Sequence, residues 1–275
     1  MAHSIYYKTI AEDNINYVYI KIGGMIRLDF IGNTLFAMEQ CTPQIHIFSW
    51  YHAVLFFGAF ALFHIIIHNQ NDSLKRDRIA KICTIFMLIL QFILYGWYIV
   101  SPESLILKGL PLYTCRLVLY LFVLGQFFGK ERCLKLATYW GLYGGIAGLV
   151  FPTIFKYPFP HILQIATVTL HVYIFLVSSY YLFVRKIGMT LKDTIWCATF
   201  TAVYILVISI FNGIFGTNYI STTKMPAHLI NYVGLNLPDW LCLPCVIVGY
   251  VFVTFFQWWV SNKTIEYQTK LNRGD

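Results

Sequence analysis

The sequence predicts an all-α polytopic membrane protein, a helical bundle of about seven transmembrane helices. Seven apolar runs, each about twenty residues long, fill the chain from Phe48 to Val260. Hydrophobic residues make up 58% of the 275 residues, and charged residues make up only 12%. A soluble domain carries about twice that charged fraction. These observations together predict a single membrane domain.

Each of the seven runs is long enough to cross a bilayer. At about 1.5 Å per residue, twenty helical residues extend over about 30 Å of hydrocarbon. We place the spans at residues 48–69, 82–100, 110–129, 134–155, 161–184, 194–215 and 241–261. The connections between them are short except for residues 216–240, which have room to form a cap.

This placement divides the chain into three regions. Residues 1–46 are predicted to form an extracytoplasmic N-terminal arm, residues 47–262 the seven-span domain, and residues 263–275 a cytoplasmic tail. Within the arm, Asn16–Met38 is moderately apolar but interrupted by charges, which favours a lid or an interfacial segment over an eighth span. The first thirty residues contain no compact apolar segment typical of a cleavable signal peptide. We therefore expect the first span to act as the insertion signal.

The net charge of +8 indicates membrane topology rather than nucleic-acid binding. Thirteen of the twenty lysines and arginines fall in the first, third and fifth connections and in the tail, whereas six fall in the arm and the other connections. Because basic residues stay in the cytoplasm, this bias predicts an outside N-terminus and a cytoplasmic C-terminus. We expect an integral, multi-pass plasma-membrane protein that has membrane lipids, and no nucleic acid, as partners.

The seven cysteines predict neither a disulfide framework nor a metal site. Their odd number argues against complete pairing, and they form no zinc-ligand spacing with the histidines. We therefore expect no metal and no cofactor. Cys242 and Cys245 form a C-x-x-C pair at the start of the last span, and the spacing suits either a redox dithiol or two structural thiols.

Four glycines form one face of the fourth predicted span. They stand at helical offsets of 3, 4 and 7 residues: Gly141, Gly144, Gly145 and Gly148. Small residues at this spacing let a neighbouring backbone approach closely. The pattern predicts a packing seam of the bundle.

Leu110-Pro-Leu-Tyr-Thr-Cys-Arg116 opens the third span and places a thiol and a cation within the membrane. The nucleophilic form of Cys115 is the thiolate, which apolar burial disfavours and a nearby cation favours. Arg116 points about 100° away from Cys115 on a helix and shares a face with Tyr113. Alternatively, Cys115 is a small apolar filler and Arg116 extends to lipid phosphate.

A polar stripe in the fifth span supplies a candidate base. Gln164, Thr167 and His171 recur at offsets of 3 and 7, and His171 lies deep, about ten residues from the outer end. A neutral imidazole at that depth could deprotonate a thiol or a hydroxyl. A hydrogen-bonded core histidine is the alternative. His52, near the start of the first span, lies at a depth similar to that of Cys115.

Amides and hydroxyls gather where the sixth span ends. Asn212 is followed by Gly216-Thr-Asn-Tyr219, which contains Asn218 and Tyr219. These groups could bind a polar head group or stabilise an oxyanion. Helix capping explains them equally well.

From about Phe48 onward the chain resembles the YwaF-type family of integral membrane proteins. Six features in order carry the resemblance: Ser49-Trp-Tyr-His52, Leu110-Pro-Leu-x-x-Cys115, Trp140-Gly-x-x-Gly144 followed by Pro152, His171, Gly216-Thr-Asn-Tyr219, and Lys224-Met-Pro226. Eukaryotic relatives of this fold look like lipid acyltransferases that use a membrane-embedded cysteine with a histidine, roles that the resemblance places on Cys115 and His171. The chain departs from the family at Tyr113, where the family usually has histidine, and at Pro238-Asp-Trp-Leu-Cys242, where it has Trp-Pro-Trp-Tyr.

Three hypotheses follow for the function. The first is a thiol-dependent lipid acyltransferase with an outward-facing polar cavity, in which Cys115 and His171 are catalytic and an acyl-donor lipid is the partner. The residues expected to bind substrate are Arg116, His52, Tyr113, Gln164, Asn212, Asn218 and Tyr219. The second is a non-enzymatic binding or transport module for a small lipid-like ligand. The third is a thiol–disulfide protein built on Cys242 and Cys245.

Overall fold

All regular elements in the described part of the chain are helices. The computed structural model describes residues 34–41, 50–68, 73–101, 105–151, 155–225, 234 and 237–273. Most of the predicted N-terminal arm lies outside these residues, including most of Asn16–Met38, and so do Ser49, Pro152 and Pro226. His52 lies in a described helix, but its side chain is outside the description.

A helix lies at each of the seven predicted ranges. The long helices are α2 (Trp50–His68), α3 (Ser73–Val100), α4 (Thr114–Phe128), α5 (Glu131–Val150), α6 (Ile162–Ser179), α7 (Leu191–Phe215) and α9 (Asp239–Arg273). Short elements connect or extend them: the π-helical turns η2 (Leu105–Gly109) and η3 (Tyr180–Val184), and the 3-10 turn η4 (Tyr219–Ser221). Helix α9 continues through most of the range that we expected to be a separate tail.

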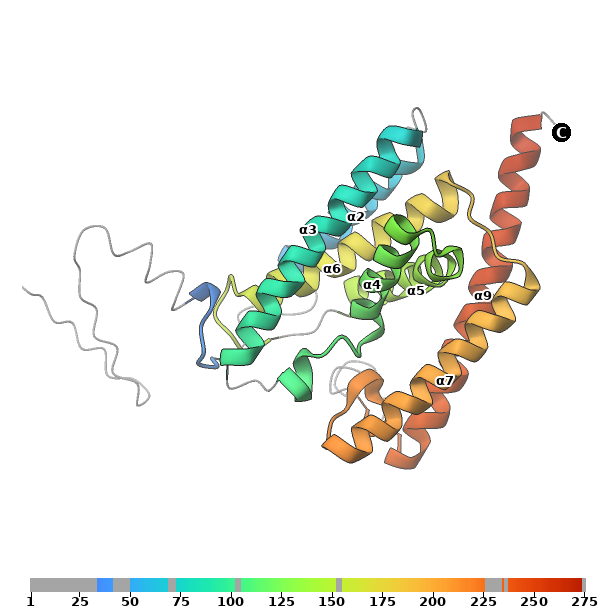
Figure 1. Cartoon of the computed structure of the whole chain (residues 1–275). Helices are drawn as coiled ribbons and strands as arrows, with labels where there is room; N and C mark the ends of the chain where they lie inside the picture. The colour runs from blue at the N-terminus through green and yellow to red at the C-terminus, as the bar shows by residue number, and fades with distance from the viewer. Residues whose placement is uncertain are drawn as a thin grey trace, which may run out of the picture.

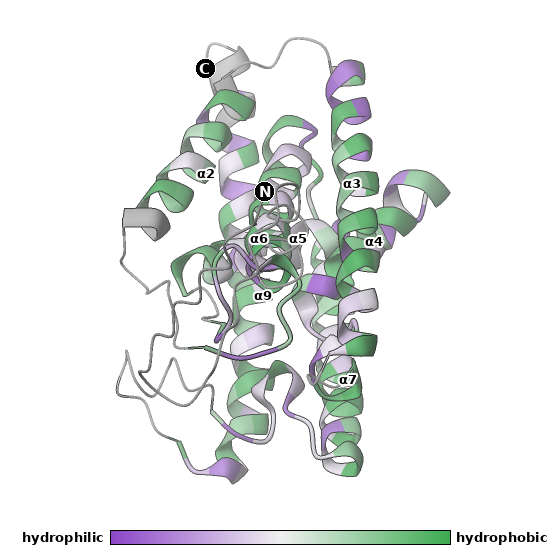
Figure 2. Cartoon of the chain, turned by 90° about the vertical axis from the view of Figure 1, so that its left-hand side faces the viewer, coloured by the Kyte–Doolittle hydropathy of each residue, from purple (hydrophilic) through white to green (hydrophobic). Residues whose placement is uncertain are grey.

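Four of the described helices are long and apolar enough to cross a membrane. They are Leu74–Val100, Ile162–Val184, Leu191–Phe215 and Asp239–Tyr267, while Ala53–Ile66 and Thr114–Phe128 are apolar but shorter. Many of their apolar side chains are exposed, and the ribbon coloured by hydropathy is predominantly green along α3 and α7 (Figure 2). The protein is therefore a multi-pass membrane protein. Seven crossings, and the orientation of the termini, stay predictions.

Helices α4, α5 and α6 form the centre of the bundle. Helix α5 packs against both α4 and α6, α6 also contacts α2 and α3, and α7 runs beside α9 (Figure 1). The run from Leu136 to Gly141 in α5 is buried throughout. Because neighbouring helices cover it, α5 does not need the continuous apolar surface of a lipid-facing helix.

The glycines of α5 make the predicted seam, with one exception. A Cβ added at Gly145 would lie 2.7–2.8 Å from Phe175 atoms, including its backbone, and one at Gly141 would collide with Ser178 on the same helix, α6. The position of Gly144 faces open space, with no heavy atom within 4 Å of an added Cβ. The sequence pattern therefore combined two faces of the helix. Offsets of 3 and 4 residues from Gly141 place Gly144 and Gly145 on either side of it, about 100° apart around the helix axis.

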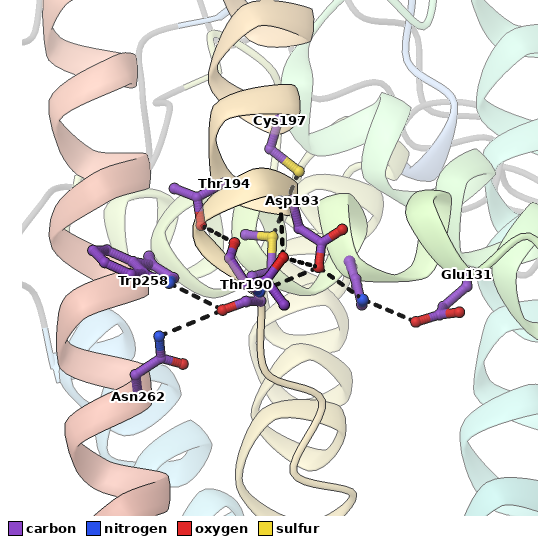
Figure 3. Close-up of polar contacts among 9 residues, drawn as sticks. Glu131, Thr190, Asp193, Thr194, Cys197, Trp258 and Asn262 are labelled. Carbon is purple, nitrogen blue, oxygen red and sulfur yellow. Dashed lines mark hydrogen bonds and ion pairs between the residues drawn. The ribbon is translucent and has the colours of Figure 1, made fainter.

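Internal hydrogen bonds join helices that are distant in the sequence. Lys135 on α5 forms ion pairs with Glu131 at 2.8 Å and with Asp193 on α7 at 3.0 Å (Figure 3). In the same network, the indole of Trp258 on α9 donates to the Met189 carbonyl at 3.0 Å (Figure 3). These contacts satisfy the polar groups at this end of the bundle and fix α7 and α9 against α5.

Candidate active site

Cys115 lies in the first turn of α4. Tyr113 precedes the helix in an extended conformation, so the chain turns into α4 immediately before the thiol. The side chain is partly buried and packs against the main apolar cluster of the bundle. Cys115 is a free cysteine.

His171 on α6 lies beside Cys115, close enough for the imidazole and the thiol to interact electrostatically. The other side of the imidazole contacts the protein backbone, where Nδ1 lies 2.8 Å from the Thr167 carbonyl oxygen. A carbonyl oxygen only accepts, so Nδ1 must carry the proton in this contact. Nε2 is then the unprotonated nitrogen that can accept the proton of the thiol. The site thus contains a nucleophile (Cys115), a base (His171) and a group that orients the base (the Thr167 carbonyl).

Gly148 provides the space that the imidazole occupies. A Cβ at this position would overlap the His171 ring, contacting Cδ2, Nε2 and Cγ. Only glycine allows α5 to pass this close to the ring. The seam glycine nearest the end of α5 therefore has a role in the site as well as in packing.

The Arg116 guanidinium is buried rather than extended to the lipid surface, with 7% of the residue exposed. Nη1 donates to the carbonyls of Lys108, Gly109 and Leu110 at 2.7, 2.8 and 3.2 Å. Nη2 donates to the Tyr98 hydroxyl at 3.3 Å. The guanidinium thus caps the free carbonyls at the end of the η2 turn, where the negative end of the helix dipole favours a cation.

Aromatic rings flank this cation. The guanidinium carbon lies 5.4 Å from the centroids of both the Tyr98 and the Tyr113 rings. Each position suits a cation–π interaction. Tyr113 was expected to share a helix face with Arg116; it instead precedes α4 in an extended conformation, with its ring beside the guanidinium. Tyr98 comes from α3 and could not be found by helical spacing. No ion pair between Arg116 and a carboxylate occurs among the described residues, so the site keeps a positive charge.

Tyr219 connects the loop after α7 to this arginine cradle. Its hydroxyl donates to the Ile106 carbonyl at 2.9 Å and accepts from the Leu110 amide at 3.2 Å. Its ring packs edge-on against Tyr113, with 4.8 Å between centroids. Tyr219 therefore braces the turn whose carbonyls hold Arg116.

The side chains of Asn212 and Asn218 are both used within the loop. Asn212 accepts from the Tyr219 amide at 2.9 Å and donates to the Tyr219 carbonyl at 2.8 Å. Asn218 accepts from the Thr223 hydroxyl at 2.7 Å and donates to the Lys224 carbonyl at 2.9 Å. These contacts match the capping interpretation of the sequence. The predicted contact with substrate has no observation in its favour at these two residues.

Gln164 caps the start of α6 and is not part of the site around the Cys115 thiol. Its Oε1 accepts from the His161 amide at 3.2 Å, while the His161 imidazole accepts from the Leu163 amide at 3.2 Å. The two side chains form a capping box. Seven residues separate Gln164 from His171, which corresponds to about 10 Å along a helix. The predicted polar stripe therefore divides into a helix cap and a base.

Three hydroxyl groups near Cys115 escaped the sequence reasoning. Thr114, Tyr143 on α5 and Tyr250 on α9 surround the start of α4, and the Thr114 and Tyr250 oxygens are 3.1 Å apart. The phenols of Tyr143 and Tyr250 lie within electrostatic range of the Cys115 sulfur. Tyrosine is common in this chain and follows no polar periodicity, so only the packing of the helices identifies these two.

The C-x-x-C pair lies in the first turns of α9. Cys242 is buried and Cys245 is exposed, and both are free thiols. The Cys242 thiol contacts the Pro238 carbonyl at 3.8 Å. Nothing in this arrangement favours the redox interpretation over structural thiols.

The fold and the site together define a class of protein: a multi-pass helical membrane protein with a cysteine and a histidine side by side between its helices. The sequence matches the TMEM164 family over residues 40–264. The chain belongs to this family, and the match encloses every candidate site residue. Comparisons with curated proteins and with solved structures gave no match.

Proposed function

We propose that this protein is a membrane lipid acyltransferase that uses Cys115 as its nucleophile and His171 as its base. The observation that carries the proposal is the placement of the His171 imidazole beside the Cys115 thiol, with the ring held by the Thr167 carbonyl and packed against Gly148. A base fixed in one tautomer against a thiol is the arrangement that thiol-dependent acyl transfer needs. The exposed apolar helix surfaces place the protein in the bilayer, together with the lipids proposed as its substrates.

The first half-reaction transfers an acyl group from a lipid ester to the enzyme. Nε2 of His171 takes the proton of the Cys115 thiol, and the sulfur attacks the ester carbonyl carbon to form a C–S bond. The tetrahedral intermediate collapses with cleavage of the ester C–O bond. His171 returns the proton to the departing alkoxide, which leaves as an alcohol, and Cys115 holds the acyl group as a thioester.

The second half-reaction runs the same steps with an acceptor. His171 takes the proton of an acceptor hydroxyl, whose oxygen attacks the thioester carbonyl. The C–S bond breaks, the acceptor becomes the new ester, and the thiolate regains its proton from His171. The proton and the acyl group are both accounted for without any further reactant.

Arg116 supplies the positive charge of this site. It follows Cys115 directly in the chain and lies within electrostatic range of the thiol. The charge stabilises the thiolate, and the guanidinium Nε, which has no hydrogen-bond partner among the described residues, is free to meet a lipid phosphate or an acyl carbonyl. Tyr113 and Tyr219 hold the guanidinium in place.

The experiment that tests the proposal is labelling of the purified protein by an acyl-bearing, thiol-reactive lipid probe. Wild type is compared with Cys115→Ser and with His171→Ala. We expect the serine variant to lose the label and the alanine variant to acquire it at least about 10²-fold more slowly, which is the usual contribution of a general base. Equal labelling of all three proteins would refute the proposal and favour a lipid-binding or transport module.

A further inference from the structure

The hydroxyl of Tyr143 is buried, and no group among the described residues meets the distance and angle of a hydrogen bond to it. Buried polar groups are satisfied in the great majority of cases, so each exception needs an explanation. Tyr143 lies in α5, on the part of the helix that faces α4 and α9. Its ring contacts Tyr250 edge-on, with 5.5 Å between centroids. The Tyr250 hydroxyl and the Cys115 thiol are its electrostatic neighbours.

The other hydroxyls near the thiol are engaged. Tyr250 shares a hydrogen bond with Thr114, the residue before Cys115, at 3.1 Å. Tyr204, which is also within range of the Cys115 sulfur, donates to the Leu112 carbonyl at 2.9 Å. Tyr143 is thus the phenol of this group, within the described residues, whose hydroxyl makes no hydrogen bond by distance and angle, although it lies beside the Tyr250 hydroxyl.

Acyl transfer at Cys115 creates a need for such a proton. When the sulfur attacks an ester carbonyl, the π electrons move onto the carbonyl oxygen, which becomes an oxyanion. His171 cannot serve this oxygen, because Nε2 faces the thiol and Nδ1 donates to the Thr167 carbonyl. A donor aimed at the developing charge is usually the largest single contribution to catalysis of this kind.

We propose that the Tyr143 hydroxyl is an oxyanion donor that hydrogen-bonds the carbonyl oxygen of the acyl group bound at Cys115. The inference rests on the proposed acyl transfer. No proton is transferred: the phenol donates a hydrogen bond while the C–S bond forms, and the bond relaxes when the carbonyl re-forms. In the free protein the Tyr143 hydroxyl makes no hydrogen bond by distance and angle, and it gains one when the substrate carbonyl oxygen binds.

The test compares two reactions of the same thiol. Acylation by p-nitrophenyl octanoate passes through an oxyanion, and its p-nitrophenolate leaves without protonation. Alkylation by iodoacetamide is a displacement at carbon that places no charge on oxygen. For Tyr143→Phe in the full chain, we expect acylation to slow by about 10²- to 10³-fold, while the rate of alkylation stays that of wild type.

Tyr139→Phe is the matched control, because Tyr139 is on the same helix and also has a buried hydroxyl without a partner of ordinary geometry. Its polar neighbours are Ser261, the Met189 backbone, Cys197 and Lys135, not Cys115. This variant should keep both rates. Replacement of Tyr143 by a ring-fluorinated tyrosine, whose hydroxyl is a stronger donor, should keep or raise the acylation rate and serves if the phenylalanine variant does not fold.

Three results would overturn the inference. Unchanged acylation of Tyr143→Phe, with acylation still lost in Cys115→Ser, would remove Tyr143 from the chemistry and leave the proposed function intact. An equal fall of acylation and alkylation would indicate an effect on the thiol or on packing. Wild type that is alkylated at Cys115 but never acylated there would refute the proposed function itself, and the oxyanion role with it.

Discussion

At the scale of single residues, the geometry of the site depends on the space that small residues leave and on the hydrogen bonds that polar side chains make. Cys115 and His171 meet because α4 and α6 both pack on α5, and because Gly148 has no side chain. Arg116 stays in the interior because three carbonyls and a phenol satisfy its guanidinium. A cation that extended to the bilayer surface would instead leave those carbonyls without donors.

Gly148→Ala tests whether the position of His171 matters. The new Cβ would overlap the imidazole, so the ring must move away from its position beside Cys115. We expect the alkylation rate of Cys115 by iodoacetamide near neutral pH to fall by about 10²-fold, the contribution of a general base. Gly144→Ala, with open space around the new Cβ, should keep the wild-type rate. Equal rates in both variants would mean that His171 does not activate the thiol.

At the scale of elements, close approach and capping position the site. Helices α5 and α6 touch through backbone at Gly145, which brings His171 to the level of Cys115. The loop after α7 folds back through Asn212 and Tyr219 onto η2, and the Arg116 guanidinium in turn caps the carbonyls of η2. The sequence predicted the glycine seam from its spacing. It could not predict the cradle, because η2, α3 and the loop meet only in the folded chain.

Gly145→Ala should separate α5 from α6. Its Cβ would lie 2.8 Å from the Phe175 backbone, which cannot yield as a flexible side chain would. We expect a loss of about 1–3 kcal/mol in the free energy of unfolding, as for overpacked cores, measured by denaturation in mild detergent. Gly144→Ala should lose nothing and can gain up to about 1 kcal/mol from helix propensity. A stable Gly145→Ala protein would contradict the tight seam.

Asn212→Ala should destabilise the protein more than Asn218→Ala. Asn212 is buried, and its amide makes hydrogen bonds to Tyr219, Thr217 and Thr222. At about 1 kcal/mol for each hydrogen bond, the loss of its four hydrogen bonds should cost about 4 kcal/mol, whereas the partly exposed Asn218 should cost about 1 kcal/mol. Unfolding in mild detergent measures both. The opposite order would favour direct substrate binding by Asn212 over a structural role.

At the scale of the whole molecule, the fold could be predicted from periodicity and hydrophobicity more completely than the site. The all-helical fold and all seven helical ranges could be predicted, because lipid requires long apolar helices with internal hydrogen bonds. Polarity inside a membrane helix marked Cys115 and His171 as separate candidates, and only the family resemblance implied that they act as a pair. Tyr98 and Tyr143 could not be predicted, since tyrosines are frequent along the chain and their roles depend on contacts between helices.

The charge bias makes a prediction about the topology of the whole chain. Seven crossings, an odd number, place the termini on opposite sides of the membrane, and the basic connections place the C-terminus in the cytoplasm. Reporters that are active on only one side, fused at Met1 and Asp275, measure this directly. We expect opposite signals at the two ends. Termini on the same side would show that the number of crossings is even and that one predicted span does not cross.

The most direct measurement of the central claim is mass spectrometry of the Cys115 peptide after incubation of the purified protein with phospholipid vesicles. Acyl transfer through the thiol predicts a fatty-acyl adduct on Cys115 that hydroxylamine removes, as expected for a thioester. The adduct should form slowly in His171→Ala, and Cys115→Ser should carry no hydroxylamine-sensitive acyl group. Cys115 that stays unmodified in a protein that exchanges acyl chains between lipids would contradict the cysteine mechanism.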